Sequence, residues 1–168
     1  MNLHTERLTL TMTTGNDLAR LSTIVTNEYV RKYLFDNEVL DTHQIHDILL
    51  RSIESFKNNG YGLWLLEDAL SQTTMGIVGL WEFFDEAQPQ LLYALLPDFI
   101  GKGIAAEASR AIVRYSFDRL GFNYVSASCD THNESSHKVA KRLGMVKTKE
   151  ATINGKPTTF YSIENKSQ

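Results

Sequence analysis

PDFIGKGIAAEASRAIVRYSF, which spans residues 97–117, places two glycines around a lysine immediately before an apolar pattern with helical spacing. Glycine-rich backbone at the start of a helix exposes unpaired N–H groups, and the helix dipole makes that end electropositive. The segment therefore predicts a helix from about residue 104 to residue 120 with an anion-binding loop in front of it. Which anion binds there depends on the surrounding elements.

The order of the elements along the chain predicts an α+β fold. Apolar residues alternate with polar ones in the expected strands and recur at helical spacing in the expected helices, so the two kinds of segment can be told apart. Before the glycine segment we expect a strand at 7–12, helices at 15–25 and 41–60, and strands at 61–68, 76–84 and 90–97. After it we expect a strand at 123–130, a helix at 134–143 and a strand pair at 145–153 and 158–165. An antiparallel meander thus leads into one crossover unit.

Composition indicates an ordinary folded domain that comprises residues 1–168. Hydrophobic residues make up 42% of the chain and charged residues 22%, both close to globular averages. The net charge of −3 and the scattered lysines and arginines predict no nucleic-acid partner. No apolar run reaches the ~18 residues of a membrane helix, and the first residues lack the apolar core of a secretory signal. We therefore expect a cytoplasmic protein without a membrane partner, either a monomer or a homodimer.

The cysteine content predicts neither a disulfide nor a metal site. Cys129 is the only cysteine, and the residues beside it have no metal-ligand spacing. No activating partner for the thiol is evident, so a small core residue is the favoured interpretation.

The two glycines suit several kinds of site. A P-loop is excluded, because Lys102 stands between the glycines instead of after them. A dinucleotide site fits better, since Gly101, Gly103 and Ala106 satisfy G-x-G-x-x-A and Asp130 ends the next strand. However, the residues PDFI separate the glycines from the preceding strand, and the chain after Asp130 ends in a strand pair instead of further βαβ units. A purely structural turn and an acyl-coenzyme A site also fit the spacing.

Two separated motifs favour acyl-coenzyme A. PDFIGKGIAAEA at 97–108 and NESSHKVAKRLGM at 133–145, in this order of elements, resemble the GNAT superfamily of N-acetyltransferases, especially its RimJ/RimL-like branch that acetylates ribosomal proteins. The resemblance begins at LHTERLTLTMTTGNDLARL, residues 3–21, and extends to the closing strand pair. It implies a mixed, mostly antiparallel central sheet with helices on both faces, in which a splayed parallel strand pair forms the acyl-CoA cleft. It also implies acetyl-CoA as co-substrate and transfer of the acetyl group to a primary amine.

The resemblance assigns the coenzyme A contacts. The family pattern [RQ]-x-x-G-x-[GA] falls on Ile100, Gly101, Lys102, Gly103, Ile104 and Ala105. The family binds the pyrophosphate with the backbone N–H groups of this loop, so Ile100 in place of Arg or Gln should weaken binding without abolishing it. Asn133 matches the asparagine that contacts the pantetheine arm, although capping of the following helix would also explain it.

The chemical step involves two further groups. Ser136 lies where the RimJ/RimL-like branch places a serine that can protonate the departing thiolate, while Ala140 replaces the tyrosine that many members use. A serine is also common in a first helical turn without any such role. The oxyanion is expected at a backbone N–H around Leu95 and Leu96, where a bulge splays the two strands apart.

The general base has the weakest sequence signal. The branch often carries an acid where this chain has Leu91, so Glu82 on the neighbouring strand is the preferred catalytic candidate, followed by His132 and His137. A solvated strand-end carboxylate would explain Glu82 equally. The N-terminal helices and their loop, residues 27–42, are expected to contact the acceptor, a protein N-terminus or a small amine. The rival hypothesis is a non-catalytic acyl-CoA-binding or sensing module.

Overall fold

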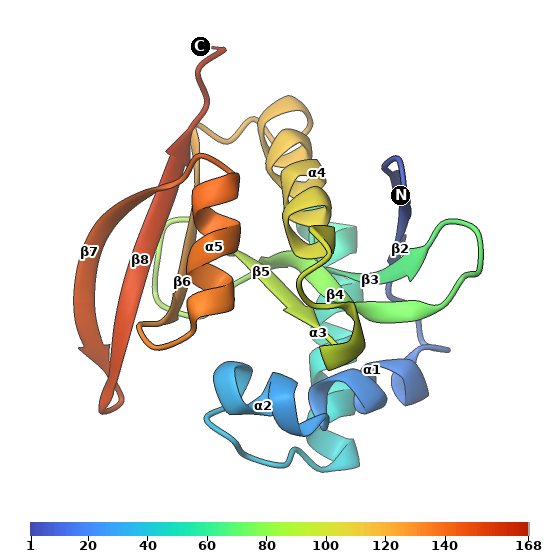
Figure 1. Ribbon diagram of the computed structural model, residues 1–168. Coiled ribbons are helices and arrows are strands. Elements are labelled where there is room, and N and C mark those ends of the chain that lie inside the picture. Colours follow the sequence, from blue (N-terminus) through green and yellow to red (C-terminus); the bar gives the residue numbers. More distant parts are fainter. Residues whose placement is uncertain (168) are drawn as a thin grey trace.

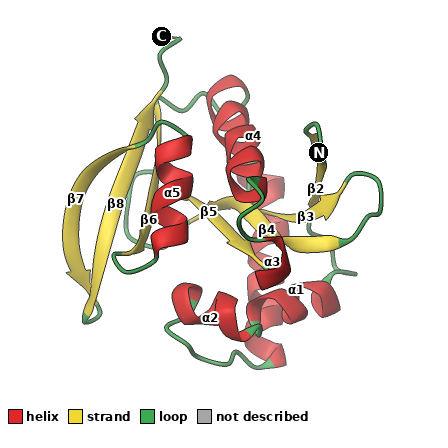
Figure 2. Ribbon diagram, in the orientation of Figure 1, coloured by secondary structure: helices red, strands yellow, loops and turns green. Residues whose placement is uncertain are grey.

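The computed structural model describes residues 1–167, and these form an α+β fold (Figures 1 and 2). Gln168, the last residue of the expected domain, lies outside the described residues. The strands are β1 (Leu3–His4), β2 (Leu8–Met12), β3 (Leu63–Asp68), β4 (Thr74–Trp81), β5 (Gln90–Leu95), β6 (Tyr124–Asp130), β7 (Val146–Ile153) and β8 (Lys156–Glu164). The helices are α1 (Leu18–Val25), α2 (Glu28–Leu34), α3 (Thr42–Asn59), α4 (Ile104–Asp118) and α5 (Glu134–Arg142), and a 3-10 turn spans Pro97–Phe99.

The strands form two antiparallel sheets. One has the order β1-β2-β3-β4-β5 and the other has the order β6-β8-β7. In the first sheet, consecutive strands pair with their neighbours, as expected when short turns connect them. The mostly antiparallel arrangement expected from the sequence is confirmed, although it is divided between two sheets.

The two sheets meet at β5 and β6, which run parallel but are not paired as strands in the described chain. Gln88, two residues before β5, donates a side-chain hydrogen bond to the carbonyl of Tyr124 on β6. The Ser128 hydroxyl on β6 donates to the Gln90 side-chain oxygen on β5 at 2.7 Å. Partner numbers increase together along both strands, which is the sense of a parallel pair. The splayed parallel pair is therefore confirmed, while the β4–β5 register from Gly76 to Trp81 contains no shift where the sequence analysis expected a bulge.

Helices cover both faces of the five-stranded sheet (Figure 1). On β3, Trp64 and Leu66 point into the core cluster that includes α4, whereas Leu63 and Leu65 point into the cluster built with α1 and α3. This follows from the two-residue period of a strand, because both of its faces are buried here.

One helix lies where the sequence analysis expected a loop. Helix α2 has only seven residues, and Asn27 begins it by accepting hydrogen bonds from the backbone N–H groups of Tyr29 and Val30. Its buried apolar side consists mainly of Val30, so the segment has too few apolar residues to show a helical period. The helix packs against β5 and brings its tyrosines to the site described below.

Candidate active site

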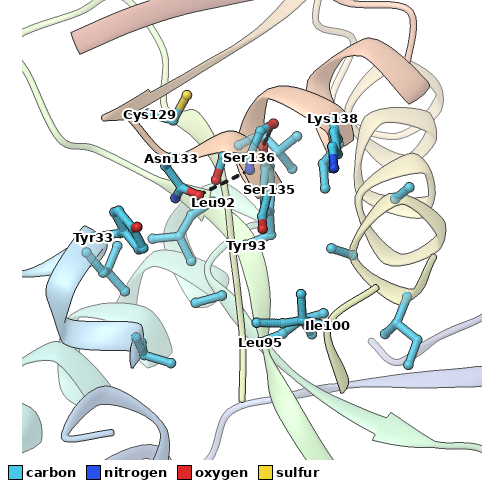
Figure 3. Close-up of a pocket in the computed structure, with 18 of the residues that line it drawn as sticks. Tyr33, Leu92, Tyr93, Leu95, Ile100, Cys129, Asn133, Ser135, Ser136 and Lys138 are labelled. Atoms are coloured by element: carbon cyan, nitrogen blue, oxygen red, sulfur yellow. Dashed lines mark hydrogen bonds between the residues drawn. The ribbon is translucent and has the colours of Figure 1, made fainter. Parts of the chain in front are cut away.

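A cavity of about 440 Å³ opens where β5 and β6 separate (Figure 3). Its wall consists of β5, the end of β6, the start of α4, one face of α5 and helix α2. Figure 3 shows Tyr33 on the side of α2, Lys138 on the side that faces α4, and Leu95 and Ile100 close together in the lower part of the view. Residues far apart in the sequence thus share one cleft.

The glycine loop forms one end of this cavity in a left-handed conformation. Gly101 has φ of 80° and Gly103 has φ of 76°, values that glycine adopts without the strain other residues incur. Gly103 also caps α4, whose first turn presents backbone N–H groups that have no partner within the helix. The loop is therefore a preformed cradle of backbone donors at the positive end of a helix.

Arg7 fastens this loop to the first sheet. Its Nη1 donates to the carbonyl of Lys102 at 3.0 Å, and its Nε donates to Glu107 at 2.6 Å. The Thr5 hydroxyl donates to the same carboxylate at 2.6 Å. Partial burial raises the pKa of Glu107, but the hydrogen bonds from Thr5 and Arg7 outweigh it and leave that pKa below its ordinary value. Glu107 thus stays ionised and helps to hold the loop.

Positive charge gathers around Gly103. A Cβ placed on Gly103 would lie 3.6 Å from Nη2 of Arg7 and 3.8 Å from Nη1 of Arg142. Lys138 and Arg142 lie one helical turn apart on α5 and both line the cavity. Within residues 1–167 neither of these two side chains has a carboxylate partner. This end of the cavity is suited to a phosphorylated ligand.

One backbone N–H at the end of β5 points into the cleft. Leu96 donates its N–H to the carbonyl of Met75 at 2.9 Å, so that group is used in contact with β4. Since successive N–H groups of a strand point to opposite edges, the N–H of Leu95 points toward the open side facing β6. Leu95 also lines the cavity, and Leu96 does not. Of the two backbone N–H groups expected to donate a hydrogen bond to the oxyanion, that of Leu95 points in the suitable direction.

Asn133 and Ser136 lie together at the start of α5 (Figure 3). The Asn133 side chain accepts a hydrogen bond from the backbone N–H of Ser136 at 3.3 Å, so it caps the helix. Both residues also line the cavity, as does Ser135, which the sequence analysis did not single out. Tyr93 from β5 donates to the carbonyl of Ser136 at 3.0 Å and thereby braces α5 against β5. Burial raises the pKa of Tyr93 well above its ordinary value, so this phenol remains protonated.

Most of the expected coenzyme A residues come together in the cavity. Those on its wall are Leu95, Ile100, Gly101, Gly103, Ile104, Ala105, Asn133 and Ser136. Lys102 lies in the same loop, but its ammonium lies 5.9 Å from the ring centre of Phe99 and the residue is outside the cavity wall. The assignment of these residues to coenzyme A stays a prediction.

Glu82 is placed away from this group. It lies just beyond β4, exposed and outside the cavity wall, and accepts a hydrogen bond from the Tyr61 hydroxyl at 3.1 Å. Burial and the Glu82 carboxylate raise the pKa of Tyr61 to about 12. His137, the second-choice base, is also outside the wall and contacts Tyr161 and the carbonyl of Thr131.

Two groups on the wall had little sequence signal. Cys129 lines the cavity, where burial and the neighbouring Asp130 raise the pKa of its thiol to about 11, so the thiol is protonated at neutral pH. Asp130 lines the cavity as well and lies 3.5 Å from the ammonium of Lys156. The sequence showed only that an acid ends the strand, and Lys156 is too far along the chain to be linked with it.

This arrangement defines a class of fold: an α+β protein whose cleft lies between two separated parallel strands, with a glycine loop and helix start at one end. In agreement, the family model described as "Acetyltransferase (GNAT) domain" matches residues 7–146. The chain belongs to the GNAT acetyltransferase family, whose co-substrate is acetyl-CoA.

Sequence similarity to known relatives extends over different lengths of the chain. The chain is 24% identical over 171 residues to the uncharacterized N-acetyltransferase YoaA of Bacillus subtilis. This match covers 96% of this chain and 95% of YoaA. It is 30% identical over 71 residues to the uncharacterized N-acetyltransferase YnaD of the same organism, and this match spans 42% of either protein. The chain thus spans less than half the length of YnaD in that match and nearly all of YoaA.

Solved structures share the whole fold. RimL, a ribosomal alpha-N-protein acetyltransferase in complex with coenzyme A, has a TM-score of 0.84 at 17% identity and full coverage of both chains. The ribosomal-protein-S5-alanine acetyltransferase from Vibrio fischeri has a TM-score of 0.81 at 20% identity, with 99% of this chain and 97% of that chain covered. At these identities the likeness establishes the fold.

The part of the chain that the structure describes has neither a metal-binding cluster nor a membrane-crossing helix. Among residues 1–167, no group of three or more His, Cys, Asp or Glu side chains is arranged to hold a metal ion. Over the same range, no helix has both the length and the apolar character that crossing a membrane requires.

Proposed function

We propose that this protein is an acetyl-CoA-dependent N-acetyltransferase that transfers the acetyl group to a primary amine by direct attack on the thioester. The observation that carries the proposal is the unpaired gap between β5 and β6, with the glycine cradle at one end and Leu95 on its wall, whose N–H points away from β4 by the alternation of the strand. Such a gap has room for an extended thioester while keeping a donor beside its carbonyl.

The residues present fit coenzyme A. The backbone N–H groups of the loop at Gly101 and Gly103 would bind the pyrophosphate, and Arg7 and Arg142 would add positive charge. A Cβ at Gly103 would lie 3.6 Å from Arg7 and 3.8 Å from Arg142, the two cations proposed to face the pyrophosphate. Asn133 would contact the pantetheine arm from the start of α5.

The chemistry needs an oxyanion donor and an acid. When the amine nitrogen attacks the thioester carbon, a C–N bond forms and the carbonyl oxygen becomes negatively charged, and the N–H of Leu95 would stabilise it. The C–S bond then breaks, and the hydroxyl of Ser136 would deliver a proton to the thiolate directly or through water. The protonated thiol of Cys129 gives no reason to invoke a covalent enzyme intermediate.

The acceptor is proposed to be a protein N-terminus or a small amine. RimL and the Vibrio fischeri enzyme act on ribosomal proteins, as their names state, and they share the fold of this chain. Helix α2 contributes Tyr29 and Tyr33 to the cavity on the side away from the cations, where an acceptor would enter.

A non-catalytic acyl-CoA-binding or sensing module is the second candidate. The observation that favours it is the position of Glu82, the expected base, which lies outside the cavity wall. Acetyl-CoA binding without transfer to any amine would support this second candidate.

Calorimetric titration with acetyl-CoA, with a nicotinamide dinucleotide as control, tests the first step. Saturable binding of acetyl-CoA alone is the expected result. A screen of short peptides with free N-termini and of small amines then tests transfer, and the release of free thiol is the quantity measured. Absence of acetyl-CoA binding would contradict both candidates, and binding without thiol release would contradict the enzyme.

A further inference from the structure

We propose that Asp130 is the residue that receives the acceptor: it binds the protonated amine and takes one of its protons. This inference rests on the proposed function and names the acceptor-binding residue of the same cavity. The observation behind it is the distribution of charge along the cavity wall.

Asp130 is the only carboxylate among the described residues of the wall. The two cations of the wall, Lys138 and Arg142, belong to α5 and lie on the side of the glycine loop. Asp130 ends β6, next to Cys129, which Figure 3 shows on the same side of the cavity as Tyr33. One end of the cavity therefore suits the phosphates of the donor, and the other end suits a cationic amine.

Neighbouring groups hold Asp130 in place and leave it with unbalanced charge. Its Oδ1 accepts a hydrogen bond from the backbone N–H of His132 at 2.9 Å, and its Oδ2 lies 3.5 Å from the ammonium of Lys156. Lys156 is closer to Asp36, at 2.9 Å. The three charged side chains together carry one more negative charge than positive charge, and Asp130 is the carboxylate of the cluster that lines the cavity.

The remaining groups near this end of the cavity are less suited to the role. The thiol of Cys129 is protonated because burial raises its pKa to about 11. His137 is outside the wall and engaged with Tyr161 and the carbonyl of Thr131. Glu82 is also outside the wall, so an amine in the cavity would not reach it without a chain of water molecules.

The protons of the step balance. A primary ammonium carries three protons on nitrogen, and the amide product keeps one. Asp130 takes the first proton before the attack, which frees the lone pair of the nitrogen, and passes it to solvent. After the C–N bond forms, the nitrogen loses a second proton to solvent. As the C–S bond breaks, Ser136 delivers a proton to the thiolate and regains one from solvent, so the products are the amide, free coenzyme A and one released proton.

The test compares two isosteric variants, Asp130→Asn and Asp118→Asn. Each changes the net charge equally, but only Asp130 lines the cavity, whereas Asp118 is an exposed residue at the end of α4. The assay measures thiol release with acetyl-CoA and the peptide or amine that the wild-type protein acetylates best, and calorimetry measures acetyl-CoA affinity. Asp130→Asn should lower kcat/KM for the amine on the order of a hundredfold, with acetyl-CoA affinity within twofold of wild type. Asp118→Asn should keep both within about threefold.

Several outcomes would overturn the inference. These are an unchanged kcat/KM in Asp130→Asn, an equal loss in Asp118→Asn, or a loss that occurs only in Glu82→Gln. If Asp130→Asn does not fold, Asp130→Glu replaces it, and partial activity with the same acceptor is then expected whereas full activity or a loss of acetyl-CoA affinity contradicts the inference. Binding of acetyl-CoA by the wild type without transfer to any amine would instead contradict the proposed function.

Discussion

Replacing Gly103 with alanine separates the cost of backbone strain from the loss of a ligand contact. Gly103 has φ of 76°, and a residue with a Cβ in this left-handed conformation costs roughly 1–2 kcal/mol. The new Cβ would meet only the ends of Arg7 and Arg142, at 3.6 and 3.8 Å, which are ordinary contact distances. Unfolding free energy should therefore fall by about 1–2 kcal/mol, and Tm by about 2–8 °C for a protein of this size.

The matched control is Gly121→Ala at the opposite end of α4. Gly121 has φ of 70° and open space around its Cβ position, so its substitution should cost the same stability. Only Gly103→Ala places a methyl group in the proposed phosphate cradle, and its acetyl-CoA affinity should fall at least about tenfold, or 1.4 kcal/mol. Thermal unfolding and calorimetric titration of both variants measure the two effects. Unchanged affinity in Gly103→Ala, or an equal loss in Gly121→Ala, would refute the assignment of the loop.

Three further substitutions test separate parts of the molecule. Ser136→Ala should lower kcat about tenfold or more while acetyl-CoA affinity stays within twofold; unchanged turnover would exclude Ser136 as the acid. Arg142→Gln should weaken acetyl-CoA binding by about 1 kcal/mol at low salt, in calorimetry, whereas Lys141→Gln, at an exposed position outside the cavity wall, should not. Ser52→Ala should lower the urea-unfolding free energy by about 1–3 kcal/mol, because the buried N–H of Leu63 loses its acceptor, and a smaller change would indicate a replacement partner.

Local patterns predicted the elements whose formation depends on neighbours in the sequence. The helix expected at 41–60 is confirmed as Thr42–Asn59, because Asp41 and Gln44 form a capping box and Gly60 ends the helix in a left-handed conformation. The strands of the meander are confirmed for a similar reason: their apolar residues recur at a fixed period, and turn residues separate them.

Features that depend on tertiary contacts were not predictable in this way. Helix α2 forms where a loop was expected, since its stability comes from packing on β5 and not from a long apolar stripe. The placement of Glu82 outside the cavity and of Asp130 on its wall depends on which strand ends meet in space. Trp64 on β3 is fully buried beside Phe56 and Tyr115, and these aromatic contacts come from segments far apart in the sequence.

Residues outside the glycine loop can supply positive charge beside it, although Ile100 stands where the family pattern has Arg or Gln. Ile100 removes the side-chain donor that the family pattern supplies in the loop, but it packs against the core and lines the cavity beside Leu95. Backbone donors survive any side-chain change, because they depend only on the loop conformation that the glycines permit. Arg7 adds charge from a different element, and Glu107 fixes its direction by accepting from both its Nε and its backbone N–H. A loop that has lost one donor can therefore keep a cationic surround, since the fold brings residues 7 and 142 to the same glycine.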